Sequence, residues 1–186
     1  MKRPAILVLA FLARATAAAA QDGVDPMAAS VAQSFTMIER DFIRLADAMP
    51  AERWTFAPKD GRFEGVRTFA EQVKHVACAN FGFFKQVERE EPPAGCESGG
   101  PSPAKTKDEL MQYLRESFAY ATRVMKRLTP GNAMDVVTGP YLGPFRGQTT
   151  RLGISTVAVW HATDHYGQLV VYLRMNGIVP PASVPR

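Results

Sequence analysis

The sequence is poor in cysteine and histidine, has no strong excess of charge of one sign, and lacks long apolar runs beyond its N-terminus. Two cysteines and three histidines occur among its 186 residues. The 22 Lys plus Arg residues outnumber the 18 Asp plus Glu residues, but residues 1–20 contain Lys2, Arg3 and Arg14 and no acid, which leaves 19 basic and 18 acidic residues. A nearly neutral protein lacks the basic face that nucleic acid binding requires, so we expect no nucleic acid partner. No run after residue 20 is long enough to span a bilayer, and we therefore expect no membrane span in the mature protein.

The first 20 residues have the three parts of a secretory signal peptide. Lys2 and Arg3 are followed by a short apolar run over 5–13 and by small residues that end at Ala20. This pattern predicts cleavage near Ala20 and export, either to the periplasm or out of the cell. The alternative is an Ala-rich N-terminus without a targeting role.

The two cysteines, Cys78 and Cys96, belong to a chain that we expect in an oxidising compartment, where disulfides form. A bond between them would tie a helix to the loop after it. The alternative is a buried free thiol at Cys78, one helical turn after His75. Spacing alone does not decide between the two.

Apolar side chains recur at helical spacing over four segments, and each segment has a recognisable start or end. The predicted helices cover about 27–48, 68–90, 106–128 and 150–176. Two begin with a capping box, Thr68 with Glu71 and Thr106 with Glu109. The pattern predicts an all-α fold, a four-helix bundle over 21–181, followed by a tail over 182–186.

The connections are long for a bundle, above all those between helices 1 and 2 (49–67) and between helices 3 and 4 (129–149). Residues 91–105 are rich in Pro, Gly and Ser, which is typical of a surface loop, and a short extended piece is expected near 134–138. Aromatic residues in the two long loops, such as Trp54 and Tyr141, either cover the bundle end or line a pocket.

The three histidines form the strongest chemical pattern. His161 and His165 stand four residues apart on the fourth predicted helix, so both project from one face. His75 lies on the second helix, and the three can meet if these helices are neighbours. Three protein ligands with an open position are typical of catalytic zinc, and nickel also accepts imidazole. Ala162 stands where a zinc protease of the thermolysin type carries Glu, which excludes that mechanism.

Three polar residues near the histidine pair are candidates for a role in catalysis. Asp164 or Gln168 could hold a ring N–H of a ligand or position water, and Tyr172 could donate a hydrogen bond to a bound molecule. The ordinary alternatives are a solvated helix charge, a surface amide and a core aromatic. Small residues after His75 are expected to leave space beside it, and Cys78 could close the site as a fourth ligand.

The chain resembles the DinB family of YfiT-like metalloenzymes over nearly all of its mature length. The resemblance rests on TFAEQVKHVA at 68–77, WHATDHYGQL at 160–169 and YLRMNGIVPP at 172–181. It implies a four-helix bundle, a nickel or zinc ion held by His75, His161 and His165, and frequent homodimers. Some members of the family are thiol-dependent transferases or isomerases, but the expected export argues against a thiol substrate here.

Three functions remain open from the sequence. The first is a metal-dependent hydrolase or transferase that acts on an unknown small molecule. The second is a non-catalytic metal- or ligand-binding protein of the cell envelope. In the third, the histidines are core residues and bind no metal.

Overall fold

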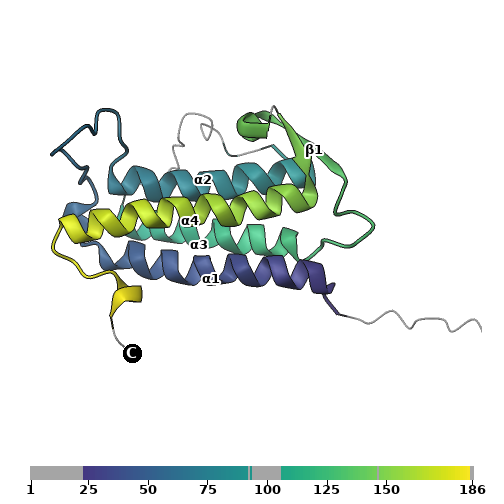
Figure 1. Ribbon diagram of the computed structural model, residues 1–186, viewed down its shortest axis with the longest axis horizontal. Coiled ribbons are helices and arrows are strands. Elements are labelled where there is room, and N and C mark those ends of the chain that lie inside the picture. Colours follow the sequence, from purple (N-terminus) through teal and green to yellow (C-terminus); the bar gives the residue numbers. More distant parts are fainter. Residues whose placement is uncertain (1–22, 92, 94–105, 146, 185–186) are drawn as a thin grey trace, which may run out of the picture.

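The computed structural model describes residues 23–91, 93, 106–145 and 147–184 (Figure 1). The predicted signal peptide, Cys96 and most of the 91–105 loop lie outside these residues. The predictions of cleavage and export therefore stay predictions.

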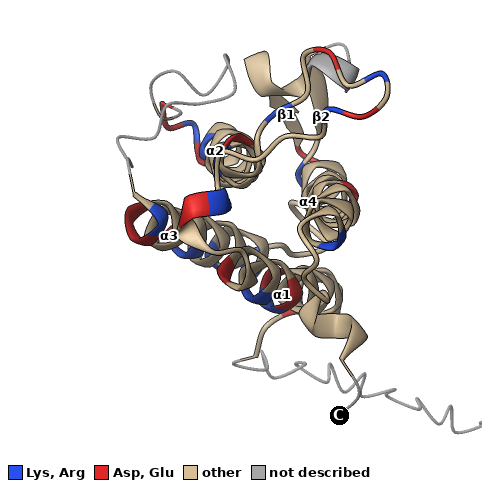
Figure 2. Ribbon diagram, turned by 90° about the vertical axis from the view of Figure 1, so that its left-hand side faces the viewer, with Lys and Arg blue, Asp and Glu red and all other residues tan. Residues whose placement is uncertain are grey.

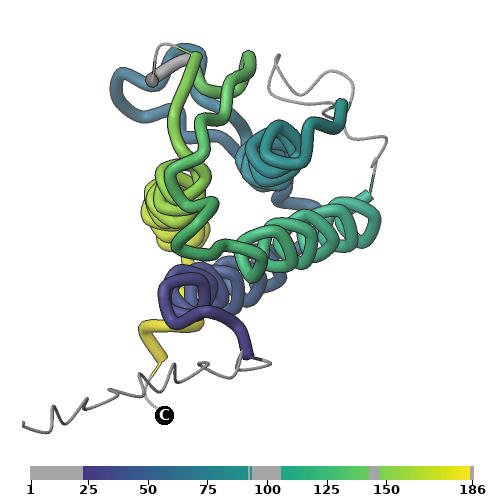
Figure 3. The backbone as a smooth tube through the Cα atoms, turned by 90° about the vertical axis from the view of Figure 1, so that its right-hand side faces the viewer, coloured from purple at the N-terminus to yellow at the C-terminus, as the bar shows by residue number. Residues whose placement is uncertain are grey.

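Four long helices make up most of the described residues, as the apolar spacing predicted. They are α1 (Pro26–Ala48), α2 (Phe69–Glu88), α3 (Lys107–Met125) and α4 (Arg151–Met175). Viewed end-on, α1 packs beside α3 and α4, and α2 packs beside α3 and α4 (Figures 2 and 3). The second and fourth helices are thus neighbours, which is the arrangement that a shared histidine site requires.

Both predicted capping boxes are present. The Thr68 backbone N–H donates to the Glu71 carboxylate at 2.7 Å, and the Glu71 N–H donates to the Thr68 hydroxyl at 3.3 Å. Thr106 and Glu109 make the same pair of bonds at 3.0 and 3.2 Å. Each box satisfies two backbone groups that a helix start leaves open, and so fixes where α2 and α3 begin.

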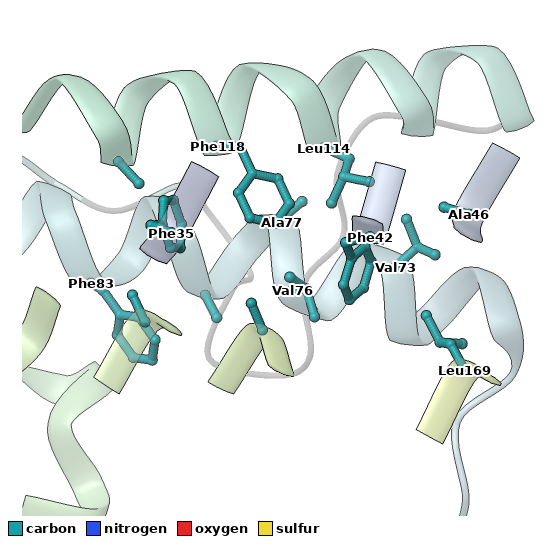
Figure 4. Packing of buried hydrophobic residues seen from close by; sticks show 14 of the residues in the cluster. Phe35, Phe42, Ala46, Val73, Val76, Ala77, Phe83, Leu114, Phe118 and Leu169 are labelled. Atoms are coloured by element: carbon teal, nitrogen blue, oxygen red, sulfur yellow. The ribbon is translucent and has the colours of Figure 1, made fainter. Parts of the chain in front are cut away.

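Phenylalanine side chains hold the centre of the bundle. Phe118 of α3 contacts both Phe35 and Phe42 of α1, with ring centroids 5.1 and 6.1 Å apart, and Phe35 also meets Phe84 of α2 at 6.3 Å (Figure 4). All four rings are buried. Burial of such aromatic rings is worth roughly 2–3 kcal/mol each, so this cluster contributes much of the stability that holds α1, α2 and α3 together.

A short hairpin fills the connection between α3 and α4. The extended piece expected near 134–138 is β1 (Val136–Thr138), which pairs antiparallel with β2 (Gln148–Thr150). The strand β2 could not be predicted from the sequence, because three residues next to a helix carry too little pattern. The 3₁₀ segment η3 (Pro140–Phe145) lies between the strands.

The aromatic residues of the first long loop cover the bundle end. The Trp54 indole N–H donates to the Met49 carbonyl at 2.9 Å, and its ring packs against Phe69 with centroids 5.5 Å apart. Phe56 meets Tyr172 of α4 edge-on at 5.8 Å.

Two short 3₁₀ turns complete the described structure: η1 (Ala51–Arg53) follows α1, and η4 (Pro181–Ser183) follows α4. Within the described residues, none of the helices has the length and apolar content needed to cross a membrane.

Candidate metal centre

The three histidines come together where α2 packs against α4. These two helices run in opposite directions (Figure 1). His75 lies on the second turn of α2, and His161 and His165 lie on successive turns of α4. Each residue offers a ring nitrogen, and these three nitrogens lie within 4.8 Å of one another. The predicted meeting of imidazoles from two helices is therefore present.

The spacing of two of these nitrogens matches a shared ion. Nε2 of His75 and Nε2 of His161 are 3.1 Å apart. Two imidazoles that bind the same ion at about 2.0–2.1 Å have nitrogens on the order of 3 Å apart, because the ion lies between them. The three rings are packed with centroids 4.5 to 5.0 Å apart. The residues present therefore fit a divalent metal ion.

The site holds its imidazoles in the neutral form. Burial lowers the pKa of His75 and of His165 to about 4, and lowers the pKa of His161 to about 2. The positive charge of Arg67 adds to the lowering at all three rings, whereas the negative charge of Asp164 opposes it at His165. Because a metal binds the unprotonated nitrogen, a ring that stays neutral at pH 7 is ready to be a ligand.

A buried glutamine orients one of the rings. Nδ1 of His165 is 2.6 Å from the side-chain oxygen of Gln72, which lies one turn before His75 on α2. An amide oxygen only accepts, so Nδ1 carries the proton and Nε2 keeps its lone pair for a ligand. Nδ1 of His161 is buried and has no hydrogen-bond partner within the described residues.

Aromatic side chains pack against α2 and against one of the histidine rings. Phe83 of α2 meets the His161 ring edge-on at 5.5 Å and is buried. Small residues after His75 were expected to leave space beside it; at one of them, Gly82, two turns further along α2, the space is filled, since a Cβ built there would lie 2.7 Å from Cδ1 of Tyr141. The second long loop therefore packs against α2 at Gly82, two turns beyond His75.

The three candidate catalytic residues have defined partners. The side-chain N–H of Gln168 donates to the Asp164 carboxylate at 2.8 Å, and both residues are exposed. The Tyr172 hydroxyl donates to the Arg67 carbonyl at 2.9 Å and so ties α4 to the residue before the α2 cap. None of these contacts tests the proposed catalytic roles, which stay predictions.

Cys78 does not offer a thiolate. It takes part in a disulfide, so the alternative of a fourth metal ligand at this position is wrong. The other cysteine of the chain, Cys96, lies outside the described residues. Across 23–91, 93, 106–145 and 147–184, the group that could hold an ion consists of the three histidines alone.

Gln72, Phe83 and Arg67 were not identified from the sequence. Gln72 had a signal, because a residue three positions before His75 shares its helix face. Phe83 is one of three phenylalanines within four positions of α2 (81, 83 and 84), and spacing alone did not separate its place from that of Phe84. Arg67 precedes the helix, and nothing in its neighbours indicated that its charge acts on the histidines.

The fold and the site together define an all-α, four-helix bundle with a three-histidine cluster suited to a divalent metal. The family model described as the DinB superfamily matches residues 34–169, so the chain belongs to the DinB superfamily. A conserved protein from Enterococcus faecalis has a similar fold, with a TM-score of 0.59 and 15% sequence identity over 78% of this chain and 94% of that one. No curated protein matches the chain.

Proposed function

We propose that this protein is an exported metalloenzyme in which His75, His161 and His165 bind a zinc or nickel ion, and that it hydrolyses a small molecule or transfers a group to or from it. The observation that carries the proposal is the meeting of three neutral imidazoles from α2 and α4 within 4.8 Å. Membership of the DinB superfamily supports it.

The chain's own residues prepare the site for such an ion. His75 and His161 present their Nε2 atoms to a common point, and Gln72 holds His165 with its Nε2 unprotonated. Phe83 shields the His161 ring from water on one side. A bound divalent ion would supply a Lewis acid that polarises a carbonyl or phosphoryl oxygen of the substrate.

The absence of a cysteine ligand favours an enzyme over a storage protein. Structural zinc sites are closed by four protein ligands, whereas catalytic sites keep one position open. The disulfide at Cys78 removes the thiolate that would have filled the fourth position. The second candidate function, a non-catalytic metal- or ligand-binding protein of the cell envelope, uses the same histidines and differs in having no turnover.

Arg67 gives the site a preference for negative charge. Burial is the main cause of the lowered pKa of the three rings, and the positive charge of Arg67, which is exposed just before the α2 cap, adds to the lowering at each of them. A substrate that carries a carboxylate or phosphate near the reacting bond would gain from both the ion and Arg67. This favours anionic compounds in a search for the substrate.

Metal content is the first test. We expect protein purified without a His tag and loaded with zinc or nickel to hold about one ion per chain. A variant with His75→Ala, His161→Ala and His165→Ala should hold none, while its helix content stays that of the wild type. Equal metal content in the two proteins would contradict the proposal.

Turnover is the second test. The zinc- and nickel-loaded proteins are assayed with esters, amides and phosphoesters, each in an anionic and a neutral form. Activity that disappears in the triple variant supports an enzyme, and a preference for the anionic member that is lost in Arg67→Ala supports the role of Arg67. Metal-loaded protein that turns over none of these compounds would instead support the binding protein.

Export is tested by the mature N-terminus. The chain is expressed with its first 20 residues, and the protein in the envelope fraction and the medium is sequenced from its N-terminus. Cleavage near Ala20 is expected. The disulfide at Cys78 supports export, because such bonds persist in oxidising compartments.

A further inference from the structure

A chain of three hydrogen bonds leads from the protein surface to the histidine site. Nδ1 of His165 is 2.6 Å from Oε1 of Gln72, Nε2 of Gln72 donates to Oε1 of Gln168 at 2.8 Å, and Nε2 of Gln168 donates to Asp164 at 2.8 Å. Followed outward from the site, these hydrogen bonds begin at His165 on α4, cross to α2, and return to α4. It ends on a carboxylate that is exposed to solvent.

The carboxylate at the end determines the direction of every bond in the chain. Ionised Asp164 only accepts, so Gln168 must turn its NH₂ group toward it. The carbonyl of Gln168 then faces Gln72, which must donate, and the carbonyl of Gln72 therefore faces His165. A carbonyl beside Nδ1 requires a proton on Nδ1.

The proton on Nδ1 decides which nitrogen of the ring can be a ligand. A neutral imidazole has one N–H and one lone pair, and the position of the proton follows the hydrogen bond made by the other nitrogen. If both amides were turned round, Gln72 would donate to Nδ1, and the proton would move to Nε2. That ring would face the other histidines with an N–H, which no metal can bind.

We propose that Gln72 and Gln168 are positioning residues whose amides hold His165 in the tautomer protonated on Nδ1, and that Asp164 sets the direction of both amides. This inference rests on the proposed function in one respect, since it assigns the tautomer a purpose in metal binding. The tautomer itself is a property of the metal-free protein.

The burial of the three residues Gln72, Gln168 and Asp164 predicts which substitution has the largest effect on the His165 tautomer. Gln72 is 3% exposed, so water does not replace its bond to His165, and a lost partner leaves a buried N–H unsatisfied. Gln168 and Asp164 are exposed, and water competes for their bond. The effect of a substitution should therefore decrease from Gln72 to Asp164.

The first measurement is the tautomer in metal-free protein. ¹⁵N NMR of the histidine rings distinguishes a protonated from an unprotonated nitrogen, and we expect His165 in wild-type protein to carry its proton on Nδ1. Asp164→Asn keeps the shape of the side chain, but its amide can either accept or donate a hydrogen bond. Both orientations of the two glutamine amides then become available, and a mixture of His165 tautomers is expected. Gln72→Leu removes the acceptor and should also give a mixture. Gln72→Glu, which only accepts, should retain the Nδ1 proton.

Glu116→Gln is the matched control. On α3 the side chain of Gln112 donates to Glu116 at 2.8 Å across four residues, as Gln168 does to Asp164, and both residues are exposed. The change removes the same charge from the same kind of pair, but not beside a histidine. It should leave the tautomer of His165 as in the wild type.

The second measurement is the affinity for zinc and nickel by calorimetry. Loss of a residue that orients a metal-bound histidine usually weakens binding by about 10- to 100-fold, which we expect for Gln72→Leu, with a smaller loss for Asp164→Asn. Gln72→Glu and Glu116→Gln should bind as tightly as the wild type or more tightly.

The outcomes separate this proposal from the proposed function. A proton on Nε2 of His165 in the wild type, or a tautomer that is the same in all variants, would overturn the role of the amide chain even if metal binds. Variants that melt at lower temperature with an unchanged tautomer would show a structural role alone. Wild-type protein that binds neither ion but has the Nδ1 proton would contradict the metal site and leave the effect of the amides on the ring established.

Discussion

At the scale of single residues, the site combines neutral imidazoles with one buried ring nitrogen that has no hydrogen-bond partner among the described residues. Nδ1 of His161 has no partner within the described residues, and the same ring places its Nε2 3.1 Å from that of His75. A buried polar group without a partner costs about 1–3 kcal/mol. This cost is understandable if the residues are retained for binding and not for stability.

The pH dependence of metal-free protein should reveal these histidines. Their pKa values of about 4, 2 and 4 in the folded protein lie below the ordinary value of 6.5. Below pH 6.5 the unfolded chain binds protons that the folded chain does not, so the free energy of unfolding falls as the pH drops from 6.5 toward 4. Urea denaturation at pH 5 and pH 7 measures this fall.

The triple His→Ala variant distinguishes the contribution of the histidines to this pH dependence from that of the carboxylates, which also titrate at low pH. It should lose less stability between pH 7 and pH 5 than the wild type does. An equal loss in both proteins would mean that the histidines are not buried in neutral form.

At the scale of the helix, two glycines in the middle of helices should respond to alanine in opposite ways. Gly167 on α4 has open space where a Cβ would be, so Gly167→Ala should stabilise the protein by about 0.5–1 kcal/mol through helix propensity. At Gly82 on α2 the added Cβ would meet the ring of Tyr141 at 2.7 Å, and overpacking of this kind costs about 1–3 kcal/mol. Thermal unfolding of both variants tests the packing of the second long loop, and stabilisation by Gly82→Ala would contradict it.

The two capping boxes offer a second comparison between helices. Thr68→Ala and Thr106→Ala each remove a hydroxyl that accepts a backbone N–H, and each should cost about 1 kcal/mol of stability. The first turn of α2 carries Gln72 and the second carries His75, whereas α3 carries no ligand. Only Thr68→Ala should therefore weaken metal binding as well, which calorimetry with zinc can measure; equal weakening by Thr106→Ala would show that the effect is one of general stability.

Helix starts, helix ends and the ligand pattern were predictable from the sequence because each depends on local chemistry. Thr68 and Glu71, or Gly177 at φ 72°, act through bonds and backbone angles a few residues away. Gln72 was missed because its role arises from contacts with α4, nearly a hundred residues further along the chain, and Arg67 was missed because its charge acts through space on rings of both α2 and α4. The small hairpin partner β2 was missed for the same reason, since its pairing with β1 is a tertiary contact.

At the scale of the whole molecule, the disulfide at Cys78 should add to stability without taking part in the metal site. A disulfide of a small domain typically contributes about 2–4 kcal/mol. Reductant, or Cys78→Ala, should lower the urea midpoint accordingly, while zinc content stays at the wild-type level. Alkylation and mass spectrometry with and without reductant verify the bond, and loss of zinc on reduction would contradict the separation of the two sites.

Homodimers, which the resemblance to the DinB family implies, stay a prediction.

The placement of the three histidines on α2 and α4 would also couple the binding of an ion to the folding of the chain. Before the last helix has formed and docked, the chain offers an ion one imidazole on one segment and two on another, and the pair on α4 shares a face only once that segment is helical. An ion held by all three imidazoles would therefore bind the folded chain more tightly than the unfolded chain, so loading with such an ion should raise the stability of the fold.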